Sequence, residues 1–303
     1  MKTIVYAQLK ETLHHDRLPN GLDVYVLPKP GFHKTYATFA TRYGSVDNHF
    51  APPGKEPIRV PDGIAHFLEH KMFEEEDGDI FLRFSSLGAS ANAYTTFERT
   101  TYLFSCTENV EENLTTLLDF VQRPYFTDQN VEKEKGIIAQ EIRMYDDDPE
   151  WRAYFGLLQG LYHRHPVRTE IAGTVESIQT ITKELLYTCY ETFYHPSNMA
   201  LFVVGPVDPG RILSLVAENQ AKKTFDPPGA IRRFYPEEPD ARAKPASRSP
   251  CRLACRSACS ALRTRPAARR ATRCSSGSWP RSSSTISSWG RAPICTRSCT
   301  TTA

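Results

Sequence analysis

The chain has 303 residues, of which 40% are hydrophobic and 24% charged, and its formal net charge is +2 at pH 7. These values are typical of a globular protein that folds as one large or two ordinary domains. No apolar run approaches the roughly 18 residues of a membrane-spanning helix. Polar residues interrupt the first 21 positions, which excludes the apolar core of a secretion signal. We therefore expect a cytoplasmic protein without a membrane partner.

Charge is unevenly distributed along the chain. The last 63 residues contain 13 of the 37 Lys and Arg residues and six of the eight cysteines, but no Asp or Glu. The other 240 residues hold all 35 acidic side chains. This change in composition predicts three regions, namely a folded α/β domain at 1–225, a linker at 226–240 and a low-complexity tail at 241–303.

Strands and helices are predicted from residue 22 onward, from runs of β-branched and aromatic residues and from helical periodicity. We expect strands at Leu22–Leu27, Tyr36–Tyr43, Ala91–Thr95, Thr101–Thr107 and Ala200–Val204. We expect helices near 63–75, 78–88, 109–123, 127–145, 148–162 and 182–193, and from 209. Asp62 and Asp148 precede two of these helices and are expected to cap them. Because strands and helices do not alternate regularly, the fold class predicted is α+β, a two-layer sandwich of a mainly antiparallel sheet packed by helices.

The most informative segment, from Asp62 to Phe73, contains the pattern H-x-x-E-H. His66 and His70 are four residues apart, so a helix places both on one face. Two imidazoles at that spacing can bind one Zn²⁺, and Glu69 lies beside them in a position to take a proton from a zinc-activated water. Alternatively, the two histidines form a packed or solvated pair on a purely structural helix.

A zinc site of this kind needs a third protein ligand and a position left open for water. Glu134 and Glu141 are about two helical turns apart on the helix expected at 127–145, with Ile137 and Ile138 on or beside the same face. We expect Glu141 to bind the metal and Glu134 to orient a metal-bound histidine. The alternative is a solvated charged helix with Glu–Lys pairs.

These two motifs together resemble the pitrilysin/insulinase family of zinc metallopeptidases, the inverzincins, whose H-x-x-E-H motif is followed later by a Glu–six residues–Glu pair. Four further segments look like family signatures: Tyr43-Gly-Ser-Val, Gly88-Ala-Ser-Ala-Asn-Ala-Tyr-Thr, His165-Pro-Val-Arg and His195-Pro-Ser-Asn-Met. The likeness covers about residues 15–225. It is strongest to a small bacterial cytosolic branch associated with elongation factor P modification.

The resemblance implies a zinc-dependent endopeptidase with one Zn²⁺ per chain. Its ligands would be His66, His70 and Glu141, with Glu69 as general base and Glu134 as the acid behind the ligands. It aligns Ala91–Thr95 with the family's substrate strand, which binds an extended peptide by β-augmentation. The residues expected there are Asn92, Ala93 and Tyr94, although Asn92 is equally well explained as an ordinary edge residue.

The resemblance also bears on partners. Small members of the family have two homologous halves that close on a peptide, and the second half supplies an Arg and a Tyr near the cleaved bond. No such half is recognisable here, so hydrolysis is expected to be impaired. A homodimer, or a heterodimer with a non-catalytic sister protein, is expected. The alternative function is a non-hydrolytic subunit that binds peptide or partner.

Three interpretations compete for the tail. It could be a basic arm for nucleic acid or acidic lipid. Its cysteines could form a metal cluster, but Cys251, Cys255 and Cys259 match no supported zinc spacing and the tail has no His. The Arg-, Ser-, Ala- and Cys-rich composition favours a third interpretation, out-of-frame translation of GC-rich DNA. We accordingly expect no nucleic-acid partner. Cys106 and Cys189, outside the tail, are predicted to be buried reduced thiols.

Overall fold

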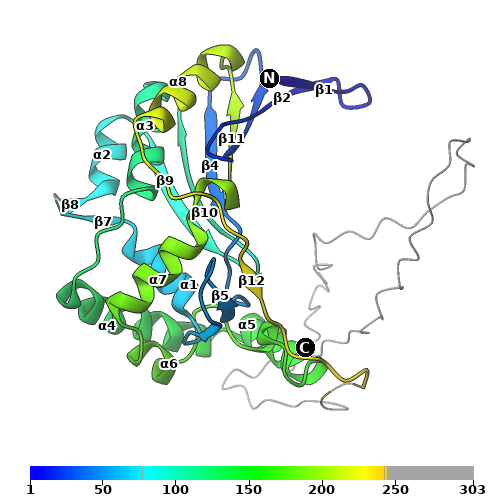
Figure 1. Cartoon of the computed structure of the whole chain (residues 1–303), viewed down its shortest axis with the longest axis vertical. Helices are drawn as coiled ribbons and strands as arrows, with labels where there is room; N and C mark the ends of the chain where they lie inside the picture. The colour runs from blue at the N-terminus through cyan, green and yellow to red at the C-terminus, as the bar shows by residue number, and fades with distance from the viewer. Residues whose placement is uncertain (77, 242, 244–303) are drawn as a thin grey trace, which may run out of the picture. The chain divides into compact units, whose positions relative to one another are not determined.

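The computed structural model describes residues 1–76, 78–241 and 243. The chain divides into two units, Met1–Arg263 and Thr264–Ala303, and all the described residues belong to the first. That unit is built on a seven-stranded sheet with the strand order β1-β2-β3-β11-β4-β10-β9 (Figure 1). Apart from residues 241 and 243, the tail on which the three interpretations bear lies outside the described part of the chain.

Neighbouring strands of the main sheet are antiparallel, except for the parallel pair of β3 and β11. The strands are β1 (Lys2–Tyr6), β2 (Glu11–Arg17), β3 (Asp23–Pro28), β4 (Thr35–Thr41), β9 (Ser90–Thr95), β10 (Thr100–Cys106) and β11 (Met199–Gly205). Two smaller sheets are formed by β5 (His49–Ala51), β6 (Ile58–Arg59) and β12 (Arg232–Arg233), and by β7 (Glu74–Glu75) and β8 (Gly78–Asp79).

The helices lie to one side of the main sheet and below it in Figure 1. They are α1 (Ile64–Lys71), α2 (Ile80–Ser86), α3 (Val110–Val121), α4 (Asp128–Asp146), α5 (Pro149–Leu161), α6 (Val175–Gln179), α7 (Lys183–Phe193) and α8 (Pro209–Ala221). Two short 3₁₀ turns, Pro166–Arg168 and Pro196–Asn198, complete the set of helical elements in the described residues. None of the helices in this part of the chain combines the length and the apolar composition that crossing a bilayer requires.

Burial alternates along the central strands, as expected for a sheet covered on one face only. In β4, Ala37 and Phe39 are fully buried, whereas Tyr36 is 38% exposed. In β11, Leu201 and Val203 are buried and their neighbours are half-buried. The predicted α+β sandwich is therefore confirmed.

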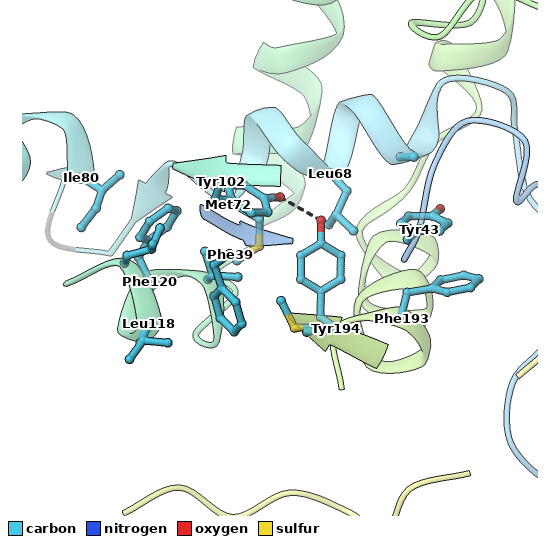
Figure 2. Close-up of a cluster of buried hydrophobic side chains, with 14 of the residues drawn as sticks. Phe39, Tyr43, Leu68, Met72, Ile80, Tyr102, Leu118, Phe120, Phe193 and Tyr194 are labelled. Atoms are coloured by element: carbon cyan, nitrogen blue, oxygen red, sulfur yellow. Dashed lines mark hydrogen bonds between the residues drawn. The ribbon is translucent and has the colours of Figure 1, made fainter. Parts of the chain in front are cut away.

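Aromatic side chains fill the space between the sheet and the helices (Figure 2). The rings of Tyr102 on β10 and Phe120 on α3 meet edge to face, with centroids 5.7 Å apart. The Tyr102 hydroxyl shares a 2.8 Å hydrogen bond with the hydroxyl of Tyr194. Leu68 of α1 is fully buried in this cluster beside Met72. Burying such a side chain contributes about 1.5–3 kcal/mol, so the core fixes α1 firmly to the sheet.

The predicted strands and helices all exist, with ends displaced by a few residues. Asp148 caps α5 as expected, because its Oδ1 accepts hydrogen bonds from the backbone N–H groups of Glu150 and Trp151. Cys106 and Cys189 are buried free thiols, also as expected. The strands β1 and β2 were not predicted from the sequence. Their side chains are largely exposed or half-buried without alternation, so only pairing with β3 defines them.

The beginning of α1 differs from the prediction. Asp62 is not its cap, because Asp62 Oδ1 accepts a hydrogen bond from Asn48 Nδ2 at 2.7 Å instead. The N-cap residue is Gly63, which has φ of 88° and makes no side-chain capping bond. A Cβ atom on Gly63 would lie 2.3 Å from the carbonyl oxygen of Ala172, and one on Gly173 would lie 2.5 Å from that of Asp62. Close backbone contact therefore replaces the cap.

The end of α1 also differs. The helix stops at Lys71 rather than near residue 75, because Glu74–Glu75 pairs with Gly78–Asp79 in a small hairpin.

The residues predicted as a linker, 226–240, contact the rest of the first unit. β12 pairs with β5 in this region. Arg233 Nε lies 2.9 Å from Asp47 Oδ1, and the Tyr235 hydroxyl donates to the same oxygen at 2.9 Å. The Glu238 carboxylate accepts hydrogen bonds from three consecutive backbone N–H groups, those of His163, Arg164 and His165. The segment is thus attached to the folded unit, and its assignment as a separate linker stays a prediction.

We predict that Gly63→Ala destabilises the protein by about 2 kcal/mol or more, because the added methyl group meets backbone in a left-handed conformation. Gly136→Ala is the matched control, since Gly136 lies inside α4 with nothing within 4 Å of its added Cβ. The control should gain about 0.5–1 kcal/mol from helix propensity. Urea unfolding of both variants measures these changes, and equal effects would contradict the assignment of strain to Gly63.

Candidate metal centre

Helix α1 places the histidines of the H-x-x-E-H motif on the side that faces α4. Phe67 and Leu68 on α1 are fully buried in the core, which fixes the rotation of the helix. His66 and His70, one turn apart, have ring centroids 4.5 Å from each other. The packing of α1 therefore sets the direction in which both imidazoles point.

Helix α4 supplies the carboxylates. It begins with a capping box in which Thr127 and Asn130 exchange side-chain and backbone hydrogen bonds. Ile138 is fully buried on the face between Glu134 and Glu141. Ile137, expected on or beside this face, is 46% exposed, so it does not share the burial of Ile138. The burial of Ile138 holds both carboxylates toward α1.

Three predicted ligands converge. His66 Nε2 lies 3.6 Å from Glu141 Oε1, and His70 Nε2 lies 3.5 Å from Glu141 Oε2. One ligand atom from each residue lies within 4.8 Å of the other two, and no other group of this kind was found in the described part of the chain. Donor atoms bound to one tetrahedral Zn²⁺ are roughly 3.3 Å apart, given bonds of about 2.0–2.1 Å. The two nitrogens and one oxygen therefore suit a zinc ion without rearrangement of the backbone.

The imidazole of His66 is kept neutral. Its side chain is only 12% exposed, and burial, helped by the charge of His70, lowers its pKa to about 3. Its Nδ1 is buried without a hydrogen-bond partner. A neutral imidazole has the free lone pair that metal binding requires, so burial prepares His66 as a ligand.

His70 is oriented by Glu134. Its Nδ1 is 3.1 Å from Glu134 Oε1, which leaves Nε2 toward Glu141. Burial acts to lower the pKa of His70, but the hydrogen bond to Glu134 and the charges of Glu69, Glu134 and Glu141 outweigh it and raise the pKa. Burial acts to raise the pKa of Glu134, but the hydrogen bond to His70 and the charges of His70 and Lys71 outweigh it, so the pKa is lowered. Glu134 thus lies behind His70, in the position that the sequence predicted for it.

Lys71 is a neighbour of this pair that the sequence analysis missed. The side chain is fully buried, and its Nζ contacts Glu74 and lies 3.6 Å from Glu134 Oε2. A signal was present, because Lys71 follows Phe67 by four residues and so lies on the apolar face of α1. A buried ammonium group needs carboxylate partners, and Glu134 is one of them.

Glu69 is 7% exposed and turns toward the edge strand β9, where its Oε2 accepts a hydrogen bond from Thr95 Oγ1 at 2.5 Å. Burial raises the pKa of Glu69 to about 7, aided by the charge of Glu141 and opposed by the Thr95 hydrogen bond and His70. A carboxyl group with this pKa can both take up and release a proton near neutral pH.

The residues predicted to bind substrate lie on β9, which forms one edge of the main sheet. Asn92 and Tyr94 are exposed, whereas Ala93 is half-buried on the same face as Thr95. Asn92 Oδ1 accepts a hydrogen bond from the backbone N–H of Ala93 at 2.9 Å. Thr95, not Asn92 or Tyr94, is the strand residue that contacts the Glu69 carboxylate, and strand alternation was the signal that could have indicated it.

The part of the chain that carries all of these residues matches a known family model. Residues 59–175 match the model described as Insulinase (Peptidase family M16), and residues 180–250 match that of the Peptidase M16 inactive domain. The chain belongs to the M16 peptidase family. The predicted resemblance to insulinase-type peptidases is therefore confirmed.

Relatives of this M16 chain are longer. The chain is 65% identical over 242 residues to the uncharacterized zinc protease YmfH of Bacillus subtilis, an alignment that covers 80% of this chain and 56% of YmfH. An M16-like peptidase from Alicyclobacillus acidocaldarius has a similar structure, with 56% identity, a TM-score of 0.75 and coverage of 77% and 55%. A protease from Helicobacter pylori, at 23% identity and a TM-score of 0.68, shares the fold over 75% of this chain and 54% of its own. The chain thus spans about half the length of these relatives.

We predict that Glu69→Gln stabilises the metal-free protein at pH 8 more than at pH 5. The folded state binds the Glu69 proton up to about pH 7, but the unfolded state loses it near 4.5. The free energy of unfolding of the wild type therefore falls as pH rises through this window, by an amount on the order of 2–3 kcal/mol. The Glu69→Gln variant has no such carboxyl group and does not lose this stability. Urea unfolding in a chelator at both pH values measures it.

The control for this prediction is Glu132→Gln, which removes a mostly exposed carboxylate from α4. A Glu69→Gln effect that is the same at pH 5 and pH 8 would contradict the raised pKa.

Proposed function

We propose that the chain carries the zinc-binding half of a metallopeptidase that hydrolyses peptide bonds in extended peptides. The observation that supports this most is the convergence of His66, His70 and Glu141 from two helices, with Glu69 beside them. Membership in the M16 family, and the similarity to YmfH, an uncharacterized zinc protease, agree with it.

The metal would be held by His66 Nε2, His70 Nε2 and the Glu141 carboxylate, one Zn²⁺ per chain. When bound, Zn²⁺ would act as a Lewis acid toward the scissile carbonyl group and lower the pKa of water in the site. Glu134 would keep the Nδ1 proton of His70 in place, so that Nε2 stays free of a proton.

Glu69 would be the general base. Its Oε2 is engaged by Thr95, so Oε1 is the atom that would take the proton of the attacking water and then pass it to the leaving nitrogen. The raised pKa of about 7 suits both transfers. Thr95 would thereby select which oxygen of Glu69 handles the proton.

An extended peptide would bind along the free edge of β9. Pairing with an edge strand gives affinity through backbone hydrogen bonds and little sequence choice. Ala93 N–H is the donor we expect to contribute, and its present partner, Asn92 Oδ1, would have to yield it to the peptide. Tyr94, 40% exposed, would contact a side chain of the peptide.

The rest of the catalytic machinery is proposed to come from a second M16 half, either in a homodimer or from a sister protein. This fits relatives that are nearly twice as long. The alternative of a non-hydrolytic binding subunit is less favoured, because such a subunit requires neither the three ligands nor a base with a pKa near neutrality. The cytoplasmic location, the elongation factor P branch and the out-of-frame origin of residues 241–303 stay predictions.

We predict that Glu69→Gln lowers peptide hydrolysis by a factor of about 10² or more while zinc content stays at the wild-type level, because Gln cannot accept the proton. A quenched fluorescent peptide measures turnover, with the chain alone and mixed with the second half of YmfH. If the Glu69→Gln chain hydrolysed the peptide at the wild-type rate, the proposed role of Glu69 as general base would be refuted. Tyr154→Phe, at an exposed position on α5, is the control that should leave the rate unchanged.

A further inference from the structure

Lys71 is a fully buried cation at the end of α1, where the neighbouring core positions are apolar. Its side chain has no exposed surface, and Phe67, Leu68 and Met72 around it on the helix belong to the hydrophobic core. Burying an ammonium group is costly unless carboxylates pair with it. An apolar side chain would fill the same position without that cost, so packing alone does not explain a lysine here.

Two carboxylates pair with this ammonium group, and their surroundings differ. Glu74, on β7, contacts Lys71 Nζ through Oε2, and its side chain is 37% exposed. The Oε2 atom of Glu134, on α4, lies 3.6 Å from the same nitrogen, and this side chain is only 10% exposed. Water can replace Lys71 at Glu74 far more easily than at Glu134. Loss of the lysine would therefore leave the buried oxygen of Glu134 without its partner.

Consecutive residues of α1 contact the two oxygens of one carboxylate. His70 Nδ1 lies 3.1 Å from Glu134 Oε1, whereas Lys71 Nζ lies near Oε2. Consecutive side chains point about 100° apart around a helix, so the carboxylate lies between the two directions. The terminal bond of a Glu side chain has no sharply preferred angle, so a contact to one oxygen leaves the carboxylate free to turn. Contacts to both oxygens fix its plane, and Lys71 thereby holds Oε1 toward His70.

The orientation of Glu134 decides which nitrogen of His70 is available to a metal. A carboxylate that accepts a hydrogen bond from Nδ1–H fixes the tautomer in which Nε2 carries the lone pair. His70 Nε2 lies 3.5 Å from Glu141 Oε2, on the side where the three ligands converge. If Glu134 turned away, either nitrogen could carry the proton, and the fraction of His70 that can bind through Nε2 would fall.

We propose that Lys71 is a positioning residue for the metal site: it holds the Glu134 carboxylate so that Glu134 keeps the proton of His70 on Nδ1. The inference rests on the proposed zinc site and deepens it, because neither the H-x-x-E-H motif nor the Glu134–Glu141 pair includes a cation. A purely structural Lys71 would instead act through Glu74, by attaching the end of α1 to the hairpin of β7 and β8.

The first test is a double-mutant cycle on the zinc affinity of the full-length chain, measured by competition with a chromogenic chelator. Lys71→Met keeps an unbranched side chain but removes the charge. We expect it to weaken zinc binding about 10-fold, the lower end of the range for outer contacts of a metal site. In a Glu134→Gln background the same substitution should change the affinity less than about 2-fold, because the residue through which Lys71 acts is already altered.

The second test is the tautomer of the His70 imidazole in the metal-free chain. Two-bond ¹H–¹⁵N NMR correlations report it at a pH at which the ring is neutral, and His70→Ala assigns the signals. We expect the Nδ1–H form in the wild type and a mixture of both forms in Lys71→Met. A lysine that only attaches α1 to the hairpin would leave this spectrum unchanged.

Glu74→Gln is the matched control. It removes the charge of the other carboxylate that contacts Lys71 and leaves Glu134 in place, so zinc affinity and the His70 tautomer should stay at their wild-type values. The melting temperature of the metal-free protein shows whether Lys71→Met is folded. If it is not, Lys71→Met/Glu74→Gln, which also removes the carboxylate left unpaired, replaces it in both tests.

An unchanged zinc affinity or an unchanged His70 tautomer in Lys71→Met would overturn the role of Lys71 and leave the zinc site intact. An equal loss of affinity in Glu74→Gln, or an undiminished effect of Lys71→Met in the Glu134→Gln background, would also overturn it. His66→Ala measures zinc bound elsewhere in the chain, including zinc bound by the six cysteines after residue 240. If His66→Ala did not lower the zinc affinity, the proposed function would be refuted, and this inference with it.

Discussion

The contact between α1 and α4 is the interaction on which the site depends. It brings two imidazoles from one helix against two carboxylates from the other, in a partly buried region. Buried titratable groups are costly unless they are paired, and the metal-free site pairs them incompletely. The pKa of His66 is lowered to about 3 and that of Glu69 is raised to about 7. Titratable groups whose pKa values are shifted this far are typical of a functional site rather than of a site that only stabilises the fold.

The surroundings of this contact explain how it is maintained. On the sheet side, Leu68 and Met72 fix α1 in an aromatic core. At its beginning, the close backbone approach at Gly63 attaches α1 to the loop before α6. On the α4 side, Ile138 is buried and a capping box sets where the helix starts. A change at any of these places would move the ligands without touching them, so we expect zinc binding and fold stability to be coupled.

Much of this arrangement could be predicted from the sequence, where the information is local. The cap at Asp148, the four-residue spacing of His66 and His70 and the seven-residue spacing of Glu134 and Glu141 depend only on helix geometry, and the structure agrees with them. The glycine-dependent start of α1 and the short strands β1 and β2 could not be predicted, because they depend on contacts with distant residues. Thr95 and Lys71 were missed although helix and strand periodicity indicated the faces on which they lie. Their residue types are common, and the carboxylate that each contacts, Glu69 or Glu134, is set by the folded chain.

We propose that three side chains from α1 and α4 bind a single zinc ion. Anomalous X-ray diffraction at the zinc edge, from crystals of the zinc-loaded full-length chain, tests it most directly. We expect one anomalous peak within about 2.0–2.2 Å of His66 Nε2, His70 Nε2 and a Glu141 oxygen. A peak bound to other residues, or a peak that Glu141 does not reach, would contradict it.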